Sequence, residues 1–207
     1  MTAESVEPGL RERKRARTRE TIARCALELF DRQGFAQTTI PQIAEAADVS
    51  PRTVSAYFPH KEELVFPEGA AQIDDLAARL RDRQPGETAA DALLAWFRAL
   101  MGELAGREEE RRTTRRVIDA DDGLRAYEQR FALRAQEALA DAFAHDLGVS
   151  RGELEPRMAA AATLTIFTLL GEDLHDDPGT TLDPEEALAT IQRALLFIGA
   201  GVRALRG

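Results

Sequence analysis

The sequence has one cysteine, Cys25, and three histidines among 207 residues. A single cysteine cannot form an intramolecular disulfide or a multi-cysteine metal site, and its apolar neighbours make Cys25 a small buried hydrophobe. Acids adjoin His145 and His175, but adjacent residues on a helix point in different directions, so no metal is expected. The sequence also lacks a glycine-rich phosphate loop, a His-Glu-x-x-His pair and a G-x-S-x-G motif. We therefore expect neither an enzyme nor a cofactor.

Long hydrophobic runs are also missing. No stretch of about 18 apolar residues is free of charge, and the first ten residues have no apolar core of signal-peptide length. We expect a cytoplasmic protein with no membrane partner. Hydrophobic residues nevertheless make up 44% of the chain, enough for the packed cores of one large domain or two small ones.

The net charge of −9 hides a division along the chain. Residues 10–61 carry ten Lys or Arg against six Asp or Glu, whereas residues 62–207 carry 17 bases and 28 acids. Any binding to a polyanion therefore belongs to the first segment. Within it, the stretch RERKRARTR has six bases among nine residues, and an exposed basic arm of this kind can follow a DNA backbone or lie in the minor groove.

Three short helices are predicted in this basic segment. Apolar residues from Ile22 to Phe30 recur with helical spacing, and Gly34 follows as a stop signal. Thr39 and Gln42 form a capping-box pattern at the start of a second helix. Asp48 tolerates the conformation of a tight turn, and a third helix follows from Pro51 to about Phe58. The second and third of these helices, with the turn between them, have the order of a helix-turn-helix unit. In such a unit the later helix, here the one from Pro51, enters the DNA major groove.

The third helix has the side chains that a DNA-reading helix needs. Ser50 is a good N-cap, and Arg52 can present its guanidinium to guanine. Small residues at positions 55 and 56 allow close approach to the bases, while Thr53, Tyr57 and Lys61 can donate to phosphates. The alternative is that the charge run is a solvated tail and the capped helix a structural unit only.

The stretch TRETIARCALELFDRQGFAQTTIPQIAEAADVSPRTVSAYFPHKEEL resembles the DNA-binding domain of the TetR/AcrR family of transcriptional regulators. The resemblance covers about residues 17–66. It implies an all-α homodimer of about nine helices, in which a three-helix DNA-binding domain precedes a larger domain whose small-molecule ligand releases the operator. The implied DNA-binding residues are Arg17, Thr39, Pro41, Gln42, Ser50, Pro51, Arg52, Thr53, Ser55, Ala56, Tyr57 and Lys61.

The chain departs from the family pattern at three positions. Asp48 stands where the family usually has glycine, Ser55 where it has tyrosine and His60 where it has a small capping residue. Asp48 is compatible with the turn, but Ser55 removes a large groove-reading side chain. The operator sequence therefore cannot be taken over from relatives. With the resemblance, we expect a basic flexible arm over residues 1–16, a helix-turn-helix domain over residues 17–62 and a ligand-binding and dimerisation domain over residues 63–207.

The last two helices predict a homodimer. Residues 158–170 are all small or apolar apart from three threonines, and the final segment carries an apolar stripe with Ile191 and Ile198. A second copy would cover both helices in a four-helix bundle, and paired recognition helices would read a palindrome. Leu164 and Ile191 are the predicted interface residues.

A ligand cavity is expected from the resemblance rather than from spacing, because core packing is the simpler explanation of an apolar helical stripe. The favoured function is a homodimeric repressor released from its operator by a small molecule. A constitutive DNA-binding or architectural protein with a purely dimerising C-terminal domain is the main alternative, and a helical enzyme is a remote one. The predicted lining residues are Trp96, Phe97, Leu100, Met101, Tyr127, Phe131, Thr165 and Phe167.

Overall fold

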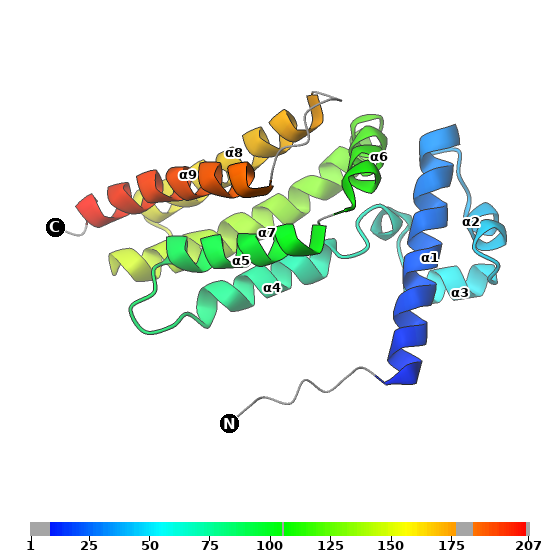
Figure 1. Ribbon diagram of the computed structural model, residues 1–207, viewed down its shortest axis with the longest axis horizontal. Helices are drawn as coiled ribbons and strands as arrows, with labels where there is room; N and C mark the ends of the chain where they lie inside the picture. The colour runs from blue at the N-terminus through cyan, green and yellow to red at the C-terminus, as the bar shows by residue number, and fades with distance from the viewer. Residues whose placement is uncertain (1–8, 105, 177–183, 206–207) are drawn as a thin grey trace. The chain divides into compact units, whose positions relative to one another are not determined.

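A computed structural model describes residues 9–104, 106–176 and 184–205 of the chain, and these residues form helices joined by short loops, with no strand (Figure 1). The predicted all-α class is confirmed. The helices are α1 (Leu10–Gln33), α2 (Ile40–Ala46), α3 (Pro51–Tyr57), α4 (Gly69–Arg81), α5 (Ala89–Leu104), α6 (Glu108–Asp119), α7 (Asp122–Leu147), α8 (Leu154–Asp176) and α9 (Pro184–Leu205), with a 3-10 turn η1 at Lys61–Leu64.

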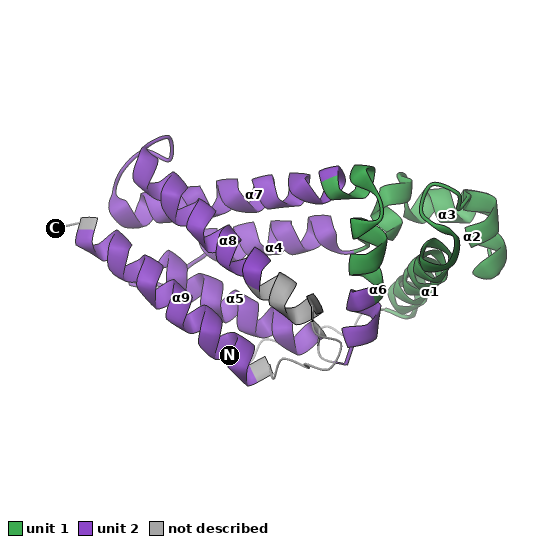
Figure 2. Ribbon diagram, turned by 90° about the horizontal axis from the view of Figure 1, so that it is seen from above, with its two compact units in different colours: residues 1–67, 113–125 green, residues 68–112, 126–207 purple. Residues whose placement is uncertain are grey.

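The chain divides into two compact units (Figure 2). Unit 1 comprises Met1–Pro67 and Thr113–Arg125, and unit 2 comprises Glu68–Arg112 and Ala126–Gly207. The boundary expected after residue 62 thus falls five residues later, and a second segment far along the chain joins the first unit. Helices α6 and α7 consequently each have residues in both units.

Buried side chains explain why residues 113–125 join unit 1. Val117, Ile118 and Leu124 are at most 4% exposed and belong to the same apolar cluster as the buried face of α1. Arg116 adds a bidentate ion pair, since its Nε and Nη2 each lie 3.2 Å from a carboxylate oxygen of Asp31. The sequence around Val117 is highly charged, but Val117, Ile118 and Leu124 form a short buried face.

Helix α1 is built as the apolar spacing predicts, but it begins earlier. Ile22 and Phe30 are at most 2% exposed, and Cys25 is buried with its Sγ 3.4 Å from the carbonyl oxygen of Ala46. The helix starts at Leu10, where the Glu12 carboxylate accepts a hydrogen bond of 3.1 Å from the amide of the preceding glycine. The prediction of a flexible arm is therefore wrong for residues 10–16, which are the first turns of α1; residues 1–8 lie outside the described residues.

A break separates the 3-10 turn η1 from α4. The 3-10 turn ends at Leu64, and α4 begins only at Gly69, two residues after Pro67. Proline cannot continue the hydrogen-bonding pattern of a preceding helix, so the chain restarts beyond it.

Unit 2 is a helical bundle in which α5 packs against α4 and α9, and α8 packs against α9 (Figure 1). A buried ion pair fixes one end of it. Arg83 Nη1 donates to Asp146 Oδ1 over 2.8 Å, and the second carboxylate oxygen accepts from the Ala89 amide over 2.7 Å. One α7 side chain thereby holds both the loop after α4 and the first amide of α5.

Helix α9 packs into this bundle with the face that was expected to meet a second copy. Ile191 is 1% exposed and Ile198 is 7% exposed within the single chain. Ile191 is thus already covered by its own protomer, and its place in an interface remains a prediction. The adjacent face is open instead, with Leu196 58% and Phe197 81% exposed.

By length and composition alone, α9 could cross a membrane, with a mean hydropathy of 1.2 over Glu185–Ala204. A third of this stretch is buried inside the protein. Helix α9 contacts α5 and α8 within unit 2.

Candidate DNA-binding site

Helix α2 is held at its first residue by a reciprocal cap. The Thr39 amide donates to Gln42 Oε1 over 2.8 Å, and Thr39 Oγ1 accepts from the Gln42 amide at 3.5 Å. The predicted capping box is therefore present. Ile43 and Ala44 are buried, at 0% and 1% exposure, whereas the capping residues Thr39 and Gln42 are exposed to solvent.

Between α2 and α3 the chain reverses in a tight turn at Asp48, which has a φ of +53°. This is the left-handed region, which aspartate tolerates better than most residues other than glycine. The turn is closed by a hydrogen bond of 2.9 Å from the Val49 amide to the Ala44 carbonyl. The replacement of the family's glycine by Asp48 thus preserves the turn.

Helix α3 begins as predicted, with Ser50 as its N-cap. The Ser50 hydroxyl accepts from the Thr53 amide over 3.0 Å and lies 2.8 Å from the Thr53 hydroxyl. Val54 and Phe58 anchor the inner face at 0% and 1% exposure. Burial of these two side chains fixes the rotation of α3 and leaves its other face in water.

The side chains predicted to meet DNA lie on the open surface of α1, α2 and α3. None is buried. Arg52 is exposed, and within the described residues it has no hydrogen bond or ion pair, so its guanidinium is available to a ligand. The exposed members of the set are Arg17, Thr39, Pro41, Gln42, Ser50, Pro51, Arg52, Ser55 and Ala56, and the partly exposed members are Thr53, Tyr57 and Lys61.

Lys61 differs from the rest because its ammonium group already has a partner. Its Nζ donates to the backbone carbonyl oxygen of Phe35 and lies 4.2 Å from the centre of the Phe35 ring. Partial burial lowers the pKa of Lys61 from its ordinary value. These contacts hold the loop between α1 and α2, so contact of Lys61 with phosphate remains a prediction.

Arg19 is a structural residue of this site that the sequence pattern did not single out from the basic run. Its two terminal nitrogens donate to the carbonyl oxygens of Tyr57 and Pro67, over 2.7 and 2.6 Å. Its guanidinium also lies 4.2 Å from the centre of the Phe58 ring. Arg19 thereby ties α1 to the C-terminal end of α3, where backbone carbonyls are left unpaired by the helix.

The predicted ligand-lining residues are distributed over α5, α7 and α8, all within unit 2. Phe97 and Phe167 stack with ring centres 5.2 Å apart, and Tyr127 meets Phe131 edge-on at 5.5 Å. Trp96 donates from its indole nitrogen to Asp75 over 2.8 Å. All eight are partly exposed except Thr165, which is exposed and donates its hydroxyl hydrogen to a backbone carbonyl of α8.

A cleft of about 720 Å³ lies elsewhere in unit 2, along α4, the loop that follows it and α7. None of the eight predicted residues lines it. Many of its lining residues are charged, and they include the paired Arg83 and Asp146 together with His145. The predicted lining set therefore remains a prediction. His175 and the acids beside it lie outside the described side chains.

The geometry defines the class of protein: an all-helical chain with a helix-turn-helix unit whose second helix exposes an arginine on a surface of small and polar residues. The model of the family "Bacterial regulatory proteins, tetR family" matches residues 22–66. HTH-type transcriptional regulator TcmR of Streptomyces glaucescens is 33% identical over 183 residues, which cover 85% of this chain and 81% of TcmR. The chain therefore belongs to the tetR family of bacterial transcriptional regulators.

Solved structures agree with the fold. NalD, the secondary repressor of the MexAB-OprM multidrug efflux pump in Pseudomonas aeruginosa, matches 88% of this chain and 96% of its own with a TM-score of 0.62 at 24% identity. Thermus thermophilus FadR, a TetR-family transcriptional repressor in complex with lauroyl-CoA, matches 86% of this chain and 93% of its own with a TM-score of 0.53 at 26% identity.

Proposed function

We propose that this regulator is a cytoplasmic homodimeric repressor, which binds a palindromic operator through α3 and leaves it when a small molecule binds unit 2. The observation that carries the DNA-binding part is the unpaired Arg52 on the exposed face of a helix whose rotation is fixed by Val54 and Phe58. A guanidinium near the N-terminal end of a groove-entering helix suits bidentate contact with guanine.

The homodimer is supported by apolar side chains that α8 and α9 leave in water. Leu154, Met158 and Leu169 of α8 are 62%, 60% and 54% exposed, and Leu196 and Phe197 of α9, which packs against α8, are 58% and 81% exposed. A self-complementary face of this kind suits a twofold interface of four helices. Leu164 is only partly exposed and packs against the core of its own unit, so it would contribute at the edge of this face.

The effector site is proposed among the aromatic residues of α5, α7 and α8. Three helices contribute partly exposed rings there, and the FadR relative binds an acyl-CoA. A ligand changes DNA affinity only if it binds the two states of the protein unequally. Helices α6 and α7 have residues in both units, so they offer a covalent route by which such a preference reaches the DNA-binding unit.

The single tryptophan makes the effector proposal testable. Because Trp96 is the only indole in the chain, its fluorescence reports any compound that binds beside it. In a screen of small apolar compounds, we expect a compound that changes the fluorescence of Trp96 to weaken the binding of the protein to its operator. Because the coupling between two binding sites is reciprocal, operator DNA should weaken the binding of that compound by the same factor. Phe167→Ala should reduce the compound's affinity, and Leu133→Ala, on an exposed α7 site, should not.

The alternative, a constitutive DNA-binding protein, predicts a different result. A compound that binds at Trp96 with no change in DNA affinity would support that alternative and contradict ligand-controlled release.

A further inference from the structure

We propose that Arg11 and Arg15, on the first turns of α1, form a second DNA contact that binds phosphates beside the segment read by α3. This inference rests on the proposed DNA binding and adds a contact between the start of α1 and the sugar-phosphate backbone of the DNA. The site consists of side chains spaced by a regular helix.

The register of α1 places these two arginines toward α3. Arg19 shows which way the helix faces, because both of its donor nitrogens reach backbone carbonyls at and beyond the end of α3. Residues four and eight positions earlier lie within about 80° of it on an α-helix. Arg15 accordingly lies with its guanidinium carbon 5.8 Å from the centre of the Tyr57 ring, and Arg11 continues the row one turn further.

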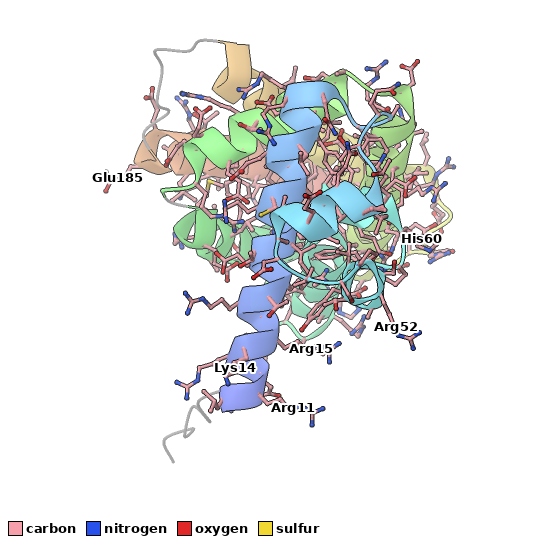
Figure 3. The ribbon with its side chains drawn as sticks, turned by 90° about the vertical axis from the view of Figure 1, so that its right-hand side faces the viewer. Arg11, Lys14, Arg15, Arg52, His60 and Glu185 are labelled. Carbon is pink, nitrogen blue, oxygen red and sulfur yellow. The ribbon has the colours of Figure 1, made fainter. Side chains whose placement is uncertain are left out.

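Figure 3 shows the result: Arg11 and Arg15 project to the same side of unit 1 as Arg52, whereas Lys14 projects to the other side. Both arginines are exposed, and neither has an ion pair within the residues that the structure describes. Helix α3 and the start of α1 therefore present cationic groups on one side of unit 1, where one anionic partner could meet them.

The charge of these turns is unfavourable for the helix by itself. Residues 10–17 carry five basic residues against one acid, Glu12. The amide dipoles leave the N-terminus of a helix positive, so basic residues there reduce its stability. A negative partner removes that repulsion, and closely spaced DNA phosphates are such a partner.

Phosphates, rather than bases, are the groups that this position suits. In the helix-turn-helix arrangement α3 occupies the major groove, and contacts from flanking elements to the backbone fix the orientation of the protein on the duplex. Because residues 10–16 are already helical, Arg11 and Arg15 are spaced about 6 Å apart along the axis without the ordering cost of a flexible arm.

The test compares the full-length protein with Arg11→Gln/Arg15→Gln and with a control, Arg13→Gln/Lys14→Gln, that removes the same charge from the other sides of the same turns. Glutamine is a good helix former, so both variants should keep the helix content of the wild type by circular dichroism. The probe is a duplex carrying the sequence that the wild type enriches from a random pool, with about ten base pairs added at each end. The dissociation constant is measured between about 50 and 200 mM KCl.

The logarithm of the binding constant decreases linearly with the logarithm of the salt concentration, and we expect this dependence to be less steep in the Arg11/Arg15 variant. The magnitude of the slope should be smaller by about 0.9 for each phosphate that the protein no longer neutralises, or roughly 3.6 for four phosphates bound by a dimer. The control should stay near the wild type, and both variants should enrich the wild-type sequence. A slope no lower than that of the control would overturn the inference, as would a changed sequence preference, which would assign base contacts to these arginines. If the wild type itself enriches no sequence, the proposed function fails, and the inference fails with it.

Discussion

Phe197 gives the sharpest test of the proposed dimer. Its side chain on α9 is 81% exposed in the single chain, whereas its neighbour Ile198 is 7% exposed. A phenylalanine has about 200 Å² of surface, so a partner could cover about 160 Å² of it, worth about 4 kcal/mol at 25 cal/mol per Å². Twofold symmetry doubles this to about 8 kcal/mol, the difference between a nanomolar and a millimolar dimer.

Phe197→Asp should therefore yield a folded monomer at micromolar concentration, with the helix content of the wild type. Sedimentation velocity or light scattering measures the mass, and circular dichroism the fold. Leu133→Asp is the matched control, because Leu133 is 62% exposed on α7 and belongs to neither α8 nor α9, and it should remain a dimer. A dimeric Phe197→Asp protein would show that the interface lies on another surface.

Two further predictions concern the ion pairs of unit 2. Asp146→Ala leaves the buried Arg83 unpaired and should lower the free energy of unfolding by about 3–5 kcal/mol in urea titrations; an unchanged midpoint would mean that water replaces the carboxylate. The hydrogen bond from Arg79, followed by one from a backbone amide, lowers the pKa of Glu87 below 4.5. A lowered carboxyl pKa stabilises the fold above the unfolded-state pKa, and this contribution is lost as the pH falls through the folded-state pKa. Glu87→Gln should accordingly be less stable than the wild type at pH 7, with a deficit that shrinks as the pH falls through the folded-state pKa of Glu87; a deficit that does not change with pH would contradict this.

The DNA-binding segment was the part of the fold most predictable from sequence, because its signals are local. The Thr39 cap, the turn at Asp48 and the cap and proline that open α3 each depend on residues within four positions of one another. The start of α1 carried a local signal too, since Glu12 caps the amide of Gly9, but the run of bases around it resembled a flexible arm.

The outcome at α9 shows what local signals leave undetermined. Apolar residues lie on more than one side of this helix, so periodicity alone cannot say which side its own protomer covers. The structure shows that Ile191 is enclosed and Phe197 is not, because α5 and α8 pack on one side. Local signals also could not predict that unit 1 is made of two separate segments of the chain. Val117 and Leu124 pack in one cluster with residues of α1 that are far away in sequence.

If α3 reads DNA through its exposed face, the loss of the Arg52 guanidinium should show it. Binding-site selection from a random duplex pool should give a palindromic sequence with the wild type. With Arg52→Ala, the same sequence should appear relaxed at one base-pair position per half-site, with discrimination there reduced by about 1–3 kcal/mol. An unaltered preference at every position would contradict the account, because α3 would then bind DNA without reading it through this arginine.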